Sequence, residues 1–106
     1  MAKRETEARM FRHVVVFRWT EDATEEQKRA VEERLAALPG AIPEIKGYHY
    51  GADAGITDGN DDFAVVADFA DRAAYITYRD HPAHRAAVDE CIRPIMATRA
   101  AVQYAI

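Results

Sequence analysis

The sequence predicts an α+β domain whose strands and helices follow the order βαββαβ. Three observations predict it. Runs rich in β-branched and aromatic residues occur at residues 10–19 and 62–69. An amphipathic helical pattern with a start signal and a stop signal follows the first of these runs, and further helical segments precede the last strand. The chain has 106 residues, which is enough for one hydrophobic core and too few for two, so we expect a single domain.

The first strand is predicted at residues 10–19, with the sequence MFRHVVVFRW. Side chains alternate between the two faces of a strand, so His13, Val15 and Phe17 share one face. Val14 and Val16 lie on the other face. Because both faces carry apolar residues, the strand is predicted to be covered on both sides.

The first helix is predicted at residues 24–38. Thr24 followed three residues later by Gln27 is a capping-box signal for its start. Apolar residues recur at helical spacing along one stripe: Val31, Leu35 and Leu38. Pro39 and Gly40 are expected to stop the helix.

The remaining elements complete the βαββαβ order. Strands are predicted at residues 44–51, 62–69 and 99–106, and helices at 71–79 and 82–96. Pro94 is expected to end or kink the last helix. The order is that of the ferredoxin-like arrangement, a four-stranded antiparallel sheet with the helices on one face.

The face of this sheet that the helices do not cover is predicted to be apolar. Val14, Val16, Val66 and Val102 would all lie on it. Stable monomers avoid a large exposed apolar patch, so we expect a twofold dimer in which the two bare faces meet. Two four-stranded sheets that face each other close into a barrel. The predicted architecture is therefore a dimeric α/β barrel.

Composition bears on the binding partners and on the cysteine chemistry of the chain. The net charge is -4, and the basic residues are interleaved with acidic ones, so no basic face for nucleic acid is predicted. The chain has one cysteine, Cys91, which rules out an internal disulfide and fits a reducing compartment.

Residues 1–9 are polar and carry both acidic and basic groups. We expect a flexible extension there and no signal peptide, with the domain itself occupying residues 10–106. No segment approaches the length that spans a bilayer, so we expect a cytoplasmic protein without a membrane partner.

Tyr78, His81 and His84 form the most informative cluster, with Pro82 between the two histidines. The proline predicts that one helix ends near Asp80 and another begins at Pro82. His84 then lies in the first turn of a helix, where the partial positive charge favours the neutral imidazole, and a neutral imidazole can act as a general base. The alternative is that both histidines cap or fill the helix junction.

The predicted topology brings the cluster opposite the first strand. Together they would enclose a mostly apolar cavity for a small molecule, with no requirement for a metal or redox cofactor. In that cavity His84 would accept a proton from a carbon next to a carbonyl, and Tyr78 would donate a hydrogen bond to the developing enolate. The expected ligand-binding residues are His13, His81, Val15, Phe17, Leu35, Phe63 and Val65. For His13 and Tyr78 the alternative is a buried residue whose polar atom is satisfied inside the core.

Three segments resemble a known family, the stress-responsive dimeric α/β-barrel (Dabb) proteins. They are FRHVVVFRW at 11–19, PGAIPEIKGYHYG at 39–51 and YRDHPAH at 78–84. The likeness covers residues 10–106. It implies the dimeric barrel that the valine pattern also predicts.

A plant member of this family, an olivetolic acid cyclase, closes a linear tetraketide-CoA by an aldol condensation. The chain is similar to that enzyme at His13, Tyr78, His81 and His84. The resemblance implies that His84 is the general base, that Tyr78 holds a substrate carbonyl and that His13 lines the pocket. At Leu35 and Phe63 the plant enzyme has a tyrosine and a histidine, so this pocket is expected to be more apolar.

Three functions remain open from the sequence. The first is a cofactor-free lyase or cyclase that acts on a polyketide-like or β-dicarbonyl compound by aldol-type chemistry. The second is a non-enzymatic barrel that binds apolar metabolites or contributes to stress tolerance. The third is a related barrel chemistry, such as cofactor-free oxygenation or haem handling.

Overall fold

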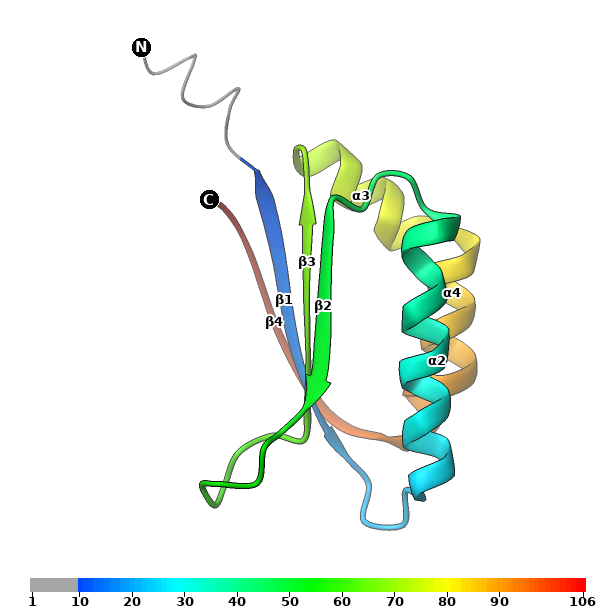
Figure 1. Ribbon diagram of the computed structural model, residues 1–106, viewed down its shortest axis with the longest axis vertical. Coiled ribbons are helices and arrows are strands. Elements are labelled where there is room, and N and C mark those ends of the chain that lie inside the picture. The colour runs from blue at the N-terminus through cyan, green and yellow to red at the C-terminus, as the bar shows by residue number, and fades with distance from the viewer. Residues whose placement is uncertain (1–9) are drawn as a thin grey trace.

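The structure, a computed structural model that describes residues 10–106, has the predicted order of elements (Figure 1). Its strands are β1 (Phe11–Trp19), β2 (Gly47–Ala52), β3 (Phe63–Phe69) and β4 (Met96–Ala105). Its helices are α2 (Glu25–Ala41), α3 (Arg72–Asp80) and α4 (Pro82–Ala87), followed by a π-helical turn η1 (Val88–Ile92) and a 3₁₀ turn η2 (Arg93–Ile95). The flexible extension expected at residues 1–9 lies outside the described residues.

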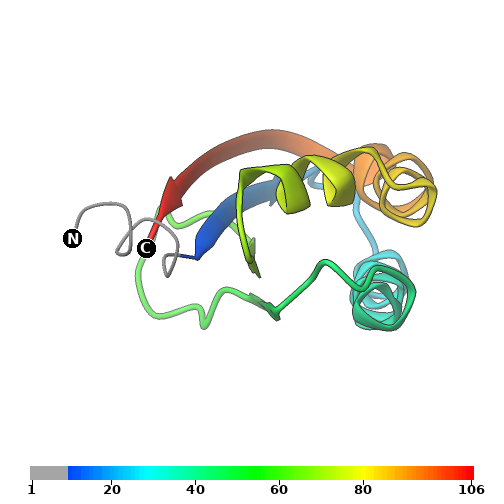
Figure 2. The same cartoon turned by 90° about the horizontal axis from the view of Figure 1, so that it is seen from above.

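The four strands form one antiparallel sheet in the order β2-β3-β1-β4. Val15 in β1 lies opposite Val65 in β3 and Ala101 in β4, which fixes the register across the centre of the sheet. The helices lie on one side of this sheet (Figures 1 and 2). The ferredoxin-like α+β fold predicted from the sequence is confirmed.

The hydrophobic core lies between the sheet and the helices. Alternate residues of β1 and β3 face it, which is the period-two pattern of a strand with one face against the core. The helices contribute buried apolar residues at helical spacing: Val31, Leu35 and Leu38 from α2, and Ile92 and Ile95 from the turns after α4.

No helix from residues 10–106 lies over the opposite face of the sheet (Figures 1 and 2). Val14, Val16 and Val66 are half-buried there, and Val102 of β4 is 54% exposed. These are the four valines that the sequence places on the bare face.

Within residues 10–106, no helix is long and apolar enough to cross a membrane.

The end of α2 differs from the sequence prediction. The helix continues through Pro39 and Gly40 to Ala41, and the Ile42 N–H donates to the Leu38 carbonyl at 2.9 Å. Proline removes one backbone hydrogen bond, to the residue four positions earlier. In the last turn this loss is small, because Leu38 and Ile42 are buried on either side of Pro39 and hold the turn in place.

Residues 82–96 also differ from the prediction, since they do not form one regular helix. α4 ends at Ala87, and the chain then widens into η1, where the Arg93 N–H bonds to the Val88 carbonyl five residues earlier. Pro94, which has no N–H to donate, lies in η2, and β4 begins directly afterwards. β4 therefore starts at Met96, which pairs with Trp19, three residues earlier than predicted.

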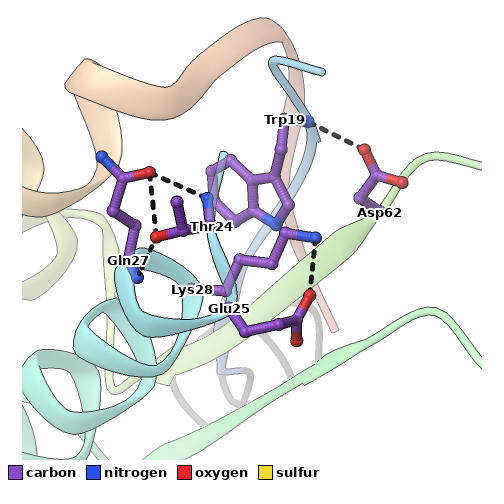
Figure 3. A network of polar contacts seen from close by, with 6 residues as sticks. All are labelled: Trp19, Thr24, Glu25, Gln27, Lys28 and Asp62. Atoms are coloured by element: carbon purple, nitrogen blue, oxygen red, sulfur yellow. Dashed lines mark hydrogen bonds and ion pairs between the residues drawn. The ribbon is translucent and has the colours of Figure 1, made fainter. Parts of the chain in front are cut away.

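A set of polar contacts stabilises the region where β1 leads into α2 (Figure 3). The predicted capping box is present: the Gln27 N–H donates to Thr24 Oγ1 at 3.1 Å, and the Thr24 N–H donates to Gln27 Oε1 at 2.9 Å. Beside it, the Trp19 N–H donates to Asp62 Oδ2 at 2.8 Å, where the β1–β4 register shifts. These bonds satisfy backbone donors that neither the helix nor the sheet can pair.

Candidate functional site

A cavity of about 350 Å³ lies between the sheet and the helices. Seven of the residues predicted for the site line it: His13, Val15, Phe17, Leu35, Val65, Tyr78 and His84. They come from β1, β3, α2, α3 and α4, so the fold brings together groups that are far apart in the sequence. The volume is in the range of small-molecule sites, and both apolar and polar side chains line it.

His84 lies in the first turn of α4, as the His-Pro-x-His spacing predicts. Its Nδ1 is 3.0 Å from the backbone carbonyl of Arg79. A carbonyl oxygen only accepts hydrogen bonds, so Nδ1 must carry the hydrogen, and Nε2 then has a free lone pair. Burial lowers the pKa of His84 below its usual 6.5, and the positive charges of Arg85 and Arg99 lower that pKa further, against the opposing effect of the Arg79 carbonyl. At neutral pH His84 is therefore an uncharged proton acceptor.

Tyr78 lies directly beside this base, with its ring centre 4.2 Å from that of His84. Its hydroxyl is 3.0 Å from the hydroxyl of Tyr48 in β2. Burial raises the pKa of Tyr48 to about 12 and raises the pKa of Tyr78 further, so both phenols keep their protons. When Tyr48 donates to Tyr78, the hydrogen of Tyr78 is left to bond a ligand.

His13 lies in the middle of the sheet and is 5% exposed. The side-chain amide nitrogen of Gln103 in β4 lies 2.8 Å from its Nδ1 and donates to it, which places the imidazole hydrogen on Nε2. Burial and the charge of Arg99 lower the pKa of His13 to about 4. The ring is therefore neutral at pH 7, with an N–H available as a hydrogen-bond donor.

Two of the predicted site residues do not line this cavity. His81 caps α4, since its Nδ1 accepts from the Ala83 N–H at 3.0 Å. For this residue the structure matches the capping alternative. Phe63 packs in the core near the end of the sheet, with ring centres 5.7 Å from Trp19 and 6.4 Å from Tyr50.

Sequence reasoning missed several residues of the site. The polar ones are Tyr48, Tyr75, Arg79, Arg85, Asp89, Arg93 and Arg99 in the cavity wall, and Gln103 behind His13. Arg99 and Gln103 lie opposite Phe17 and His13 in the β1–β4 ladder. Alternation along the last strand, once its register was known, would have placed both on the side of the helices.

Metal ligands are not gathered here. Within residues 10–106, no three His, Cys, Asp or Glu side chains lie close enough together to hold a metal ion.

A known family matches nearly the whole chain. The family described as the stress responsive A/B barrel domain (Dabb) matches residues 11–106. None of the proteins with curated functions matches the sequence significantly.

Solved structures with the same fold come from bacteria and plants. A dimeric ferredoxin-like protein of unknown function from Thermobifida fusca is 46% identical, with a TM-score of 0.87 over 94% of this chain and 93% of that one. A Dabb family protein from Mesorhizobium loti is 25% identical, with a TM-score of 0.75 over 91% of this chain and 95% of that one. The hydroxynitrile lyase from Passiflora edulis is 19% identical, with a TM-score of 0.82 over 93% of this chain and 94% of that one, a likeness that concerns the fold alone.

Proposed function

The chain belongs to the Dabb family of stress-responsive A/B barrel domains, and on that premise we propose that it is a homodimeric barrel whose cavity binds a small carbonyl compound and removes a proton from it. His84 is the proposed base. Tyr78 and His13 are the proposed hydrogen-bond donors. The walls formed by Val15, Phe17, Leu35 and Val65 hold the apolar part of the ligand.

The dimer is supported by the bare face of the sheet. Half-buried and exposed valines line it, and burying them against a second copy removes apolar surface from water. The loop from 53 to 62 projects from the sheet on the side away from the helices, where it would lie beside the partner (Figure 1). The relative from Thermobifida fusca, 46% identical, is itself described as dimeric.

The observation that carries the catalytic proposal is the hydrogen bond from His84 Nδ1 to the Arg79 carbonyl. It holds the ring beside Tyr78 and leaves Nε2 as the acceptor. A general base needs a lone pair at neutral pH and a fixed orientation. Burial and the charges of Arg85 and Arg99 support the first, and the contact with the Arg79 carbonyl supports the second.

The proposed step is the removal of a proton from a carbon next to a carbonyl. The C–H bond breaks, the proton moves to His84 Nε2, and the electron pair moves onto the carbonyl oxygen. The O–H of Tyr78 and the Nε2–H of His13 donate to that developing enolate. In an aldol-type cyclisation of a polyketide-like compound, the enolate carbon then bonds to a second carbonyl carbon, and His84 returns its proton to the resulting alkoxide. The sequence of steps is redox-neutral.

A direct test is deuterium exchange at carbon. The methylene hydrogens of 1-phenylpropan-2-one are followed by NMR in D₂O with the wild type, with His84→Asn and with Arg72→Gln as a matched control. Arg72 opens α3, is exposed and lies outside the cavity wall. The wild type and the control should accelerate exchange, and His84→Asn should lose about a hundred-fold of that acceleration, as is typical when a general base is removed.

Equal exchange in the wild type and His84→Asn would show that His84 is not the base. Binding of the ketone by the wild type without any acceleration of exchange would instead support a non-enzymatic barrel. Circular dichroism of each variant verifies that the fold is kept.

A further inference from the structure

The cavity is basic although the chain as a whole is acidic. The net charge of the chain is -4, whereas the cavity wall holds four arginines and a single aspartate. The arginines are Arg79, Arg85, Arg93 and Arg99. Neither the proton transfer nor the apolar part of the ligand requires this concentration of positive charge.

Two of these arginines already have acidic partners. Arg79 bonds both carboxylate oxygens of Asp80, at 2.9 and 3.1 Å, and Arg93 bonds Asp89 at 3.2 Å. Arg85 and Arg99 form no side-chain hydrogen bond or ion pair with the part of the chain that the structure describes. Two guanidinium groups of the cavity are therefore not directly bonded to an acidic group of residues 10–106. Arg85 still acts on Asp80, because its charge lowers the pKa of that carboxyl group.

The unpaired arginines belong to opposite walls of the cavity. Arg99 is in β4, opposite Phe17 and on the same side of the sheet as His13. Arg85 follows His84 directly in α4. Arg99 lies close enough to both imidazoles for its positive charge to lower the pKa of His13 and the pKa of His84. Arg85 also lowers the pKa of His84. The proposed base thus lies near positive charge from both the helix and the sheet, and the carboxylate of Asp80 opposes part of it.

A carboxylate matches this arrangement. A guanidinium group donates two parallel, charge-assisted hydrogen bonds to the two oxygens of a carboxylate. A bound anion also offsets the positive charge around His84, which raises the pKa of this base towards neutral pH and makes it a stronger proton acceptor.

We propose that the cavity selects organic acids, with the carboxylate of the ligand bound by Arg99 and Arg85 and its apolar part against Phe17 and Leu35. The inference rests on the proposed function in that it uses the same cavity. It names the class of substrate: a small keto acid or aryl-substituted acid that carries its carboxylate near the reacting carbon.

The test compares three probes of similar size by isothermal titration calorimetry on the purified full chain. They are 4-phenylbutanoate, its neutral amide 4-phenylbutanamide, and phenyl phosphate. Each is titrated into the wild type, Arg99→Gln, Arg85→Gln, His84→Asn and the exposed control Arg72→Gln. The wild type and the control should bind the acid about ten-fold more tightly than the amide, the effect of one charge-assisted hydrogen bond.

Arg99→Gln should reduce that preference to less than about three-fold, with a smaller loss in Arg85→Gln, while both variants still bind the amide as the wild type does. His84→Asn keeps both arginines, so this variant should still bind the acid more tightly than the amide even if the proposed catalysis fails. Equal binding of acid and amide by the wild type, binding of neither, or a preference unchanged in both arginine variants would overturn the proposal. Tighter binding of phenyl phosphate than of the acid would overturn the carboxylate assignment in favour of a phosphate ester.

Discussion

The buried imidazole of His13 makes the stability of the fold depend on pH. In the folded chain its pKa is about 4, against 6.5 for an unperturbed histidine, because the ring is buried between the sheet and the helices near Arg99. Between these two values the unfolded chain binds a proton that the folded chain does not. Stability is therefore fully present above pH 6.5 and is lost as the pH falls towards 4.

The magnitude follows from the two pKa values. The whole difference corresponds to about 3 kcal/mol, and about 2 kcal/mol of it is already lost at pH 5.0. The hydrogen bond from Gln103 to Nδ1 adds to this effect, because Nδ1 can accept only while it is unprotonated.

Urea unfolding at pH 7.5 and pH 5.0, at one fixed protein concentration, measures this loss in the wild type and in His13→Gln. Glutamine does not titrate, so the wild type should lose about 2 kcal/mol more than the variant between the two pH values. The remaining acidic and histidine groups are common to both proteins and cancel in the comparison. Equal losses, or an NMR titration of His13 with a midpoint above pH 6, would refute the reasoning.

Three further pairs of substitutions test other parts of the structure. His81→Ala should lower the free energy of unfolding by about 1 kcal/mol because it removes the cap on α4, whereas His81→Asn should restore the cap; urea unfolding measures both. Val16→Asp should produce a monomer in light scattering because it places a charge on the bare face of the sheet, while Ile76→Asp, at an exposed position of α3 on the other side of the sheet, should leave the dimer intact; a dimeric Val16→Asp protein would contradict the proposed interface. Asp62→Ala should cost about 2 kcal/mol of stability because the Trp19 N–H loses its acceptor, and Asp62→Asn, which keeps an acceptor oxygen, should recover most of the loss.

The sequence predicts best what depends on neighbouring residues. Alternation in β1 places His13, Val15 and Phe17 towards the helices, and the proline after His81 correctly marks the junction of two helices. These features follow from local stereochemistry, so they need no knowledge of the rest of the fold.

Features that depend on contacts between distant parts of the chain could not be predicted from local sequence patterns. Tyr48 meets Tyr78 only through the packing of β2 against α3, and Gln103 meets His13 only through the register of β4. Pro39 is a helix-stopping residue by intrinsic preference, yet buried neighbours keep it within α2. In each of these cases tertiary contacts decide between local alternatives.

The π-helical turn η1 forms part of the cavity wall through Val88, Asp89 and Ile92. Its hydrogen bonds span five residues, so it holds more residues per turn than an α-helix does. Removing one residue there would restore ordinary helical spacing and rotate the following side chains by about 100°. Relatives that differ by a single insertion or deletion between α4 and β4 are therefore expected to present different side chains to the space between the helices and the sheet while keeping the same sheet.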